Sequence, residues 1–212
     1  MLAKLAIIMD YYDCHESIEL HVEIWLENLK SELPTVYGRD YILYMLISWV
    51  FTHSDIFQKM TRLALRHSGK LIECEGLLPL PTYILEEIDK ARQDSLDKLF
   101  SAIYDLLDRL LEETECSYEC SSMSLGVLTK ELSKRGILSP RITQPFDGWS
   151  IDGTKEMIKG LRRPKWYDNT RLGSRHSCTI QEKLSLAIDK VEDELRVFDL
   201  QDLQFLNSVK CV

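Results

Sequence analysis

The sequence predicts an all-α protein, built as an array of seven to nine helices with one long central helix. Three observations support this fold class. Apolar residues recur at spacings of three and four through most of the chain. Apolar residues make up 45% and charged residues 28% of the 212 residues, a balance that can bury a core. We find no internal repeat and no low-complexity tract, and expect β-structure to be nearly absent.

Four helices are expected before the long one, and they differ in how much of their surface is apolar. The helix over 39–51, "RDYILYMLISWVF", is apolar around most of its circumference and should be buried on most sides. "THSD" then offers N-cap residues, and Gly69 is a suitable stop for the helix between them. Trp25 and Trp49 are expected in the core. The expected ranges are 1–12, 17–33, 39–51 and 54–68.

The longest helix is expected over 82–113, after Pro79 and Pro81 have blocked an earlier start. Its apolar residues from Ile84 to Leu111 repeat at three and four, with charges on the other face. At roughly 30 residues it would span about 45 Å. We expect a domain boundary at its end, with an N-terminal helical bundle over 1–113 and a C-terminal helical region over 114–212.

The C-terminal region is expected to be rich in loops. The loop "SPRITQPFDGWS" carries Trp149, and the connector "RRPKWYDNTRLGSR" carries Trp166. These two tryptophans either pin their loops to the body or contribute to a partner surface. Helices are expected over 122–135, from Ser150 or Asp152 to Leu161, and over 179–198.

Charge and cysteine content narrow the class of protein. The net charge of −8 and the pI near 5.2 disfavour a general nucleic-acid binder, which needs a basic surface. Six cysteines are too few for a secreted disulfide scaffold of this length. The start "MLAKLAIIMDYYD" does not resemble a signal peptide, and no apolar run is long enough to cross a membrane. We therefore expect an intracellular protein, cytoplasmic or nuclear, whose cysteines are thiols or metal ligands.

Two cysteine-containing stretches form a candidate zinc site. "CSYEC" places Cys116 and Cys120 at i and i+4, and "RHSC" places His176 and Cys178 two residues apart. Both spacings can supply ligands to one ion, and thiolate with imidazole suits zinc. Such a site would tie the end of the long helix to the start of the last one and fasten segment 137–178. The alternative is that the cysteines are small buried apolar residues and His176 lies on the surface.

The sequence also resembles the region that follows the BTB domain in a family of fungal BTB-domain-containing proteins. The motifs that carry the resemblance include "LAIIMDYYDCHESIELHVEIWLENL", "LLPLPTYILEEIDKARQDSLDKLFSAIYDLLDRL", "CSYECSSMSLGVLTKEL", "GILSPR" and "RHSC". The resemblance implies a helical extension, with cysteines and a histidine at these matching points. A BTB fold would precede Met1 and is absent from this chain, so BTB dimerisation and recruitment of cullin-type ubiquitin ligases do not carry over.

These observations favour a non-catalytic, adaptor-like protein-interaction module over an enzyme. Cys14 and His15 are adjacent and poorly placed as a catalytic dyad, and no glycine-rich phosphate loop is present. We expect a protein partner. Self-association through segment 1–12 is one form that this interaction can take. The alternatives are a transcription-associated regulatory factor with a basic contact patch at "RRPKW" (162–166), or an unrecognised enzyme.

Overall fold

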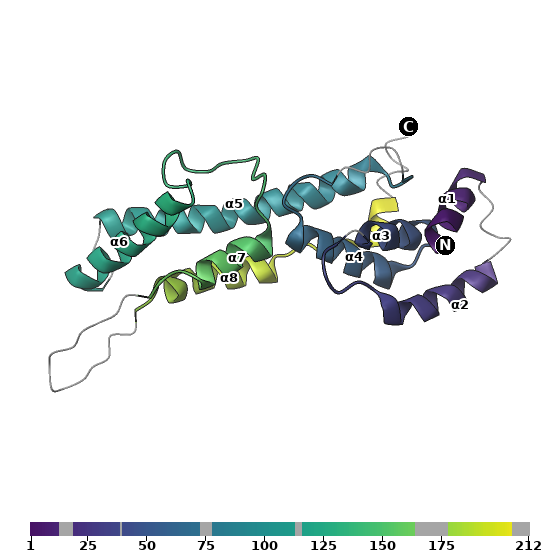
Figure 1. Cartoon of the computed structure of the whole chain (residues 1–212), viewed down its shortest axis with the longest axis horizontal. Helices are drawn as coiled ribbons and strands as arrows, with labels where there is room; N and C mark the ends of the chain where they lie inside the picture. Colours follow the sequence, from purple (N-terminus) through teal and green to yellow (C-terminus); the bar gives the residue numbers. More distant parts are fainter. Residues whose placement is uncertain (13–18, 39, 73–77, 113–115, 164–177, 205–212) are drawn as a thin grey trace. The chain divides into compact units, whose positions relative to one another are not determined.

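A computed structural model describes residues 1–12, 19–38, 40–72, 78–112, 116–163 and 178–204. Within these ranges the chain contains the α-helices α1 to α8, one 3-10 helix, a short helical stretch at 200–204 and no strand (Figure 1). This confirms the predicted all-α fold with one long helix. None of the described helices is both long enough and apolar enough to span a bilayer.

The described residues pack into two compact units. The first contains those within Met1–Arg92 and Arg196–Val212, and the second those within Gln93–Leu195. This clustering divides α5 between Arg92 and Gln93 and places the segment after α8 in the first unit, while the regions 1–113 and 114–212 expected from the sequence stay a prediction. There the Tyr83 hydroxyl donates a hydrogen bond to the Leu203 carbonyl oxygen at 2.9 Å, and Arg196 forms an ion pair with Glu87.

The first unit is organised around α3, whose sequence is almost entirely apolar. Seven of the ten residues of α3 are buried, and α3 packs against both α1 and α4. Trp49 is buried beside Phe57 as predicted, whereas Trp25 is only half-buried and lies next to His21. The elements of this unit before the long helix are α1 (Leu2–Tyr12), α2 (Glu19–Leu29), η2 (Lys30–Glu32), α3 (Tyr41–Val50) and α4 (Ser54–His67).

The long helix α5 (Thr82–Glu112) has 31 residues and matches the predicted range. Its apolar residues at three-four spacing are buried in both units, as Ile84 and Ile88 are in the first and Leu96 and Phe100 in the second. Leu111 is the exception, because 62% of its surface is exposed at the last turn. The apolar pattern therefore predicted the burial of this helix until its final residues.

The second unit combines the remainder of α5 with α6 (Tyr118–Lys134), α7 (Ile151–Lys159) and α8 (Ile180–Asp193). α6 begins four residues before the predicted start at 122, because Ser117 caps it by accepting a hydrogen bond from the Cys120 backbone N–H. Thr179 and Glu182 form a capping box at the start of α8. α7 and α8 pack against each other, and α8 ends before the predicted Phe198.

The loop between α6 and α7 is attached to α5 by several contacts. The Tyr104 hydroxyl donates to the Ile137 carbonyl at 2.7 Å and accepts from the Ile142 N–H at 3.0 Å. The Phe100 ring lies 5.3 Å from that of Phe146 and 5.1 Å from that of Trp149, between ring centroids. Trp149 thus pins its loop to the body. These contacts attach the described residues from Ile137 to Trp149 to α5, while the expectation that zinc fastens segment 137–178 stays a prediction.

We predict that Tyr104→Phe lowers the free energy of unfolding by about 1–3 kcal/mol. The change removes the hydroxyl that pairs with the Ile137 carbonyl oxygen and the Ile142 N–H. Urea denaturation followed by circular dichroism would measure the change. Tyr118→Phe is the matched control, since Tyr118 is 77% exposed. Equal stability of the Tyr104 variant and the parent would show that the hydroxyl does not hold the loop.

Candidate metal centre

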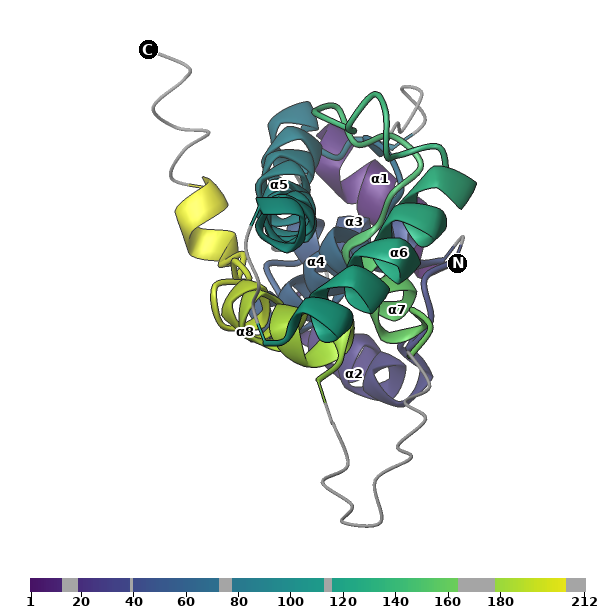
Figure 2. The ribbon, with the colours of Figure 1, turned by 90° about the vertical axis from the view of Figure 1, so that its left-hand side faces the viewer.

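Three of the four predicted metal ligands lie where two helices begin. Cys116 directly precedes Ser117, the N-cap of α6, and Cys120 is the third residue of that helix. Cys178 directly precedes Thr179, the N-cap of α8. Figures 1 and 2 show that α6 and α8 begin at the same end of the second unit. The two capping motifs therefore fix each cysteine relative to its own helix, and the packing of the second unit brings the two helix starts together.

The three sulfur atoms form a compact triangle. The Sγ atoms of Cys116, Cys120 and Cys178 all lie within 4.8 Å of one another, and all three are free thiols. In a tetrahedral zinc site with Zn–S bonds of about 2.3 Å, two sulfur atoms would lie about 3.8 Å apart. Small side-chain rotations would therefore convert the triangle into one face of a zinc tetrahedron.

The three thiols differ in their access to solvent. Cys120 is buried, Cys178 is half-buried and Cys116 is exposed. Burial raises the pKa of Cys178 to about 11, and a hydrogen bond with Cys116 and the nearby Cys120 act in the same direction. Clustered thiols resist ionisation because each thiolate would repel the next. A divalent cation between them removes that repulsion and favours thiolates as ligands.

Two features of the surrounding chain favour negative charge at this place. Cys120 lies in the first turn of α6, and Cys178 stands just before α8, so both are close to the positive end of a helix dipole. Lys183, in the first turns of α8, lowers the pKa of Cys178 through its charge, against the larger effect of burial. The sequence alone does not single out Lys183, because nothing in its spacing distinguishes it from other helix lysines.

The fourth predicted ligand, His176, lies outside the described residues, as do Cys14, His15 and Trp166. The described part of the chain contains no other group of three residues that could hold a metal ion. Three sulfur atoms at this separation are able to bind a soft or borderline ion such as zinc. With a nitrogen ligand in the fourth position, the set would be a Cys₃His site.

Comparison with known proteins found no matching family model, no similar curated protein and no similar solved structure. The resemblance to the region after the BTB domain of fungal proteins therefore stays a prediction from the sequence.

Proposed function

We propose that this chain is a non-catalytic, adaptor-like protein-interaction module whose second unit contains a structural zinc site. The observation that carries the proposal is the meeting of Cys116, Cys120 and Cys178 at the starts of α6 and α8. Its resemblance to the helical region after a BTB domain gives further support, and would place it inside the cell, in the cytoplasm or nucleus.

Zinc fits this site better than calcium or magnesium, because those ions prefer oxygen ligands and the described ligands are all sulfur. His176 is proposed as the fourth ligand. Four protein ligands would leave no open position for water or substrate, so the site would be structural and not catalytic. The ion would then join the start of α6 to the start of α8.

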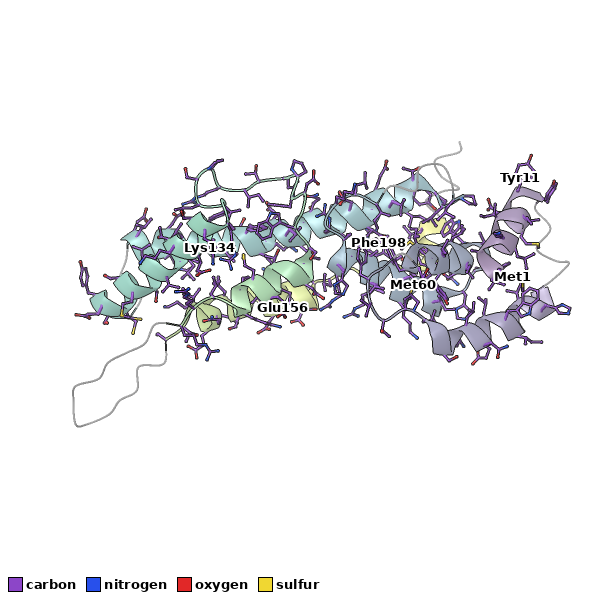
Figure 3. All side chains as sticks on the ribbon, viewed as in Figure 1. Met1, Tyr11, Met60, Lys134, Glu156 and Phe198 are labelled. Atoms are coloured by element: carbon purple, nitrogen blue, oxygen red, sulfur yellow. The ribbon has the colours of Figure 1, made fainter. Side chains whose placement is uncertain are left out.

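The proposed contact surface for a partner is the outward face of α1. Ala6 and Met9 of α1 are buried within the first unit, whereas Ile8 is 50% and Tyr12 69% exposed. Tyr11 projects away from the other helices in Figure 3. A helix with apolar residues on two faces has more apolar surface than its own unit covers. The resemblance implies that a BTB fold would cover such a face. The alternative is that a second copy of this chain covers it.

We predict that the chain, purified under reducing conditions, contains one zinc ion, and that Cys120→Ser loses it. A serine hydroxyl is a poor replacement for a thiolate ligand. Elemental analysis of the purified protein measures the metal, and circular dichroism verifies that α5 persists. Cys74→Ser is the control, since it removes a cysteine that is not one of the three. A metal-free parent, or equal zinc loss in both variants, would contradict the proposal.

We also predict that Lys183→Met weakens zinc binding by about tenfold, because groups around metal ligands contribute roughly 10–100-fold to affinity. The substitution keeps the length of the side chain and removes the charge that favours thiolate at Cys178. Competition with a chromogenic chelator measures the affinity. Lys190→Met, an exposed change on the same helix, should leave it unchanged. If both variants bind zinc as the parent does, Lys183 does not assist the site.

The α1 proposal predicts concentration-dependent self-association that is reduced by the double change Ile8→Ser and Tyr12→Ser. Both side chains are largely exposed, so the free energy of unfolding should change little while apolar contact area is lost. Light scattering over a range of concentrations measures the mass. The control is Val36→Ser, which alters an exposed apolar residue outside α1. A parent chain that stays monomeric throughout would exclude self-association through α1.

A further inference from the structure

Basic side chains gather where α6 and α7 end. Lys134, labelled in Figure 3, is the last residue of α6, and Arg162 follows shortly after α7. Arg162 Nε lies 3.7 Å from Glu131 Oε1 on α6. This distance shows that the segment after α7 lies near the last turns of α6. We call this group the basic cluster; Lys134, Arg135 and Arg162 interact with Glu131, and the cluster also includes Lys130 and Arg163, which neighbour Glu131 and Arg162 in sequence.

One carboxylate sits among these cations. Arg135 Nη1 donates a hydrogen bond to Glu131 Oε2 at 2.5 Å and another to the Glu131 carbonyl oxygen at 2.9 Å. The hydrogen bond from Arg135 lowers the pKa of Glu131, and the charges of Lys134 and Arg162 lower it further. Cations from two separate helix ends therefore surround the same carboxylate.

The cluster has more positive than negative charge. Within the described part of the chain, Lys130, Lys134 and Arg163 have no ion-pair partner, while Arg135 and Arg162 share the single carboxylate of Glu131. This excess stands out because the chain as a whole has a net charge of −8. Placing a cation at the C-terminal end of a helix is favourable in itself, but that accounts for α6 residues alone and not for Arg162 and Arg163.

The carboxylate lies beneath the cations. The Glu131 side chain is only 13% exposed, whereas that of Arg162 is 82% exposed. Lys130, Lys134 and Arg163 are exposed as well. Glu131 is thus placed to orient the two arginines from below, while the atoms that face solvent are positively charged. Such a surface is suited to bind an anionic partner.

We propose that the basic cluster binds a short acidic segment of a protein partner. Guanidinium groups pair with carboxylates through two parallel hydrogen bonds, and the lysines add attraction at close range. A short segment interacts mainly with charges within a Debye length, about 8 Å at physiological salt. A nucleic acid would extend beyond the cluster over the rest of the protein, which has a net negative charge. Its phosphates would be repelled there.

On α6 this surface is separate from the proposed zinc site, whereas Arg162 follows Leu161, whose carbonyl oxygen accepts a hydrogen bond from Gln181 Nε2 at 2.5 Å near the start of α8. Cys120 and Lys134 stand at opposite ends of α6, about 20 Å apart at the rise of an α-helix. α1 belongs to the first unit, and the basic cluster belongs to the second. The proposal goes beyond the metal centre and does not depend on the presence of the ion.

The test uses the full chain as purified, with a fluorescein-labelled, glutamate-rich peptide as the probe and fluorescence anisotropy as the measurement. The expected result is saturable binding that weakens with added salt, and no binding of the peptide in which glutamine replaces glutamate. The double variant Lys134→Glu and Arg163→Glu should weaken peptide binding by about tenfold, since two exposed attractions become repulsions. Lys4→Glu with Lys70→Glu changes the net charge equally, at exposed positions of the first unit, and should leave binding within about twofold of the parent.

Three results would overturn the proposal. They are no saturable binding of the peptide by the parent chain, an equal loss in the control variant, and tighter binding of a single-stranded oligonucleotide that displaces the peptide. If the glutamate variant lost its helical circular dichroism, Lys134→Gln with Arg163→Gln would replace it. That milder change should still weaken binding, and unchanged affinity would count against the cluster.

Discussion

The apolar stripe of α5 is the constraint on which both packed units depend. Residues at three-four spacing along this helix are buried in each unit, with Ile88 in the first and Leu96 in the second. Because the stripe continues along one helix, two cores share one element and neither needs a sheet. The chain then attaches further segments to the same helix through polar groups. The Tyr83 hydroxyl makes a hydrogen bond to the segment after α8. The Tyr104 hydroxyl makes two hydrogen bonds to the loop after α6.

Helix capping positions the candidate metal centre. Ser117 and Thr179 are ordinary N-cap residues, each accepting a hydrogen bond from a backbone N–H in its own helix. Their side chains fix where α6 and α8 begin, and the cysteines immediately before these caps are fixed with them. Cys120 then points from the first turn of α6 into the same place. Local rules of helix initiation thus account for each cysteine, while tertiary packing accounts for their meeting.

Local patterns predicted most of the fold. The range of α5, the N-cap at Ser150 and the end of α6 near 135 all follow from residue types within a few positions of each feature. The candidate site was predictable in part, since the spacing of Cys116 and Cys120 is itself typical of metal ligands. Their proximity to Cys178 depends on packing between distant segments, which the sequence pattern does not record.

The features that the sequence did not predict are those that depend on partners far along the chain. α8 was expected to reach Phe198, because Phe198 continues an apolar pattern. It is buried, but after the helix has ended. Trp25 was expected in the core because it lies in an apolar stretch, yet its neighbours cover only part of the ring. The sequence pattern also does not reveal that Tyr83 and Leu203, which are far apart in the chain, join the last described segment to the first unit.

Different kinds of interaction hold different parts of the second unit together. The contacts that attach the loop and those that join α7 to α8 do not involve the cysteine cluster. Aromatic contacts to Phe100 and hydrogen bonds to Tyr104 attach the loop after α6, at the middle turns of α5. Lys155 of α7 forms a largely buried ion pair with Glu192 of α8, which links those two helices. The cysteine cluster lies between the starts of α6 and α8, beside the buried side chains of Cys120 and Ile180. An ion bound there would therefore add to the packing at the starts of these two helices, and its loss would leave the contacts of Phe100 and Tyr104 with the loop in place.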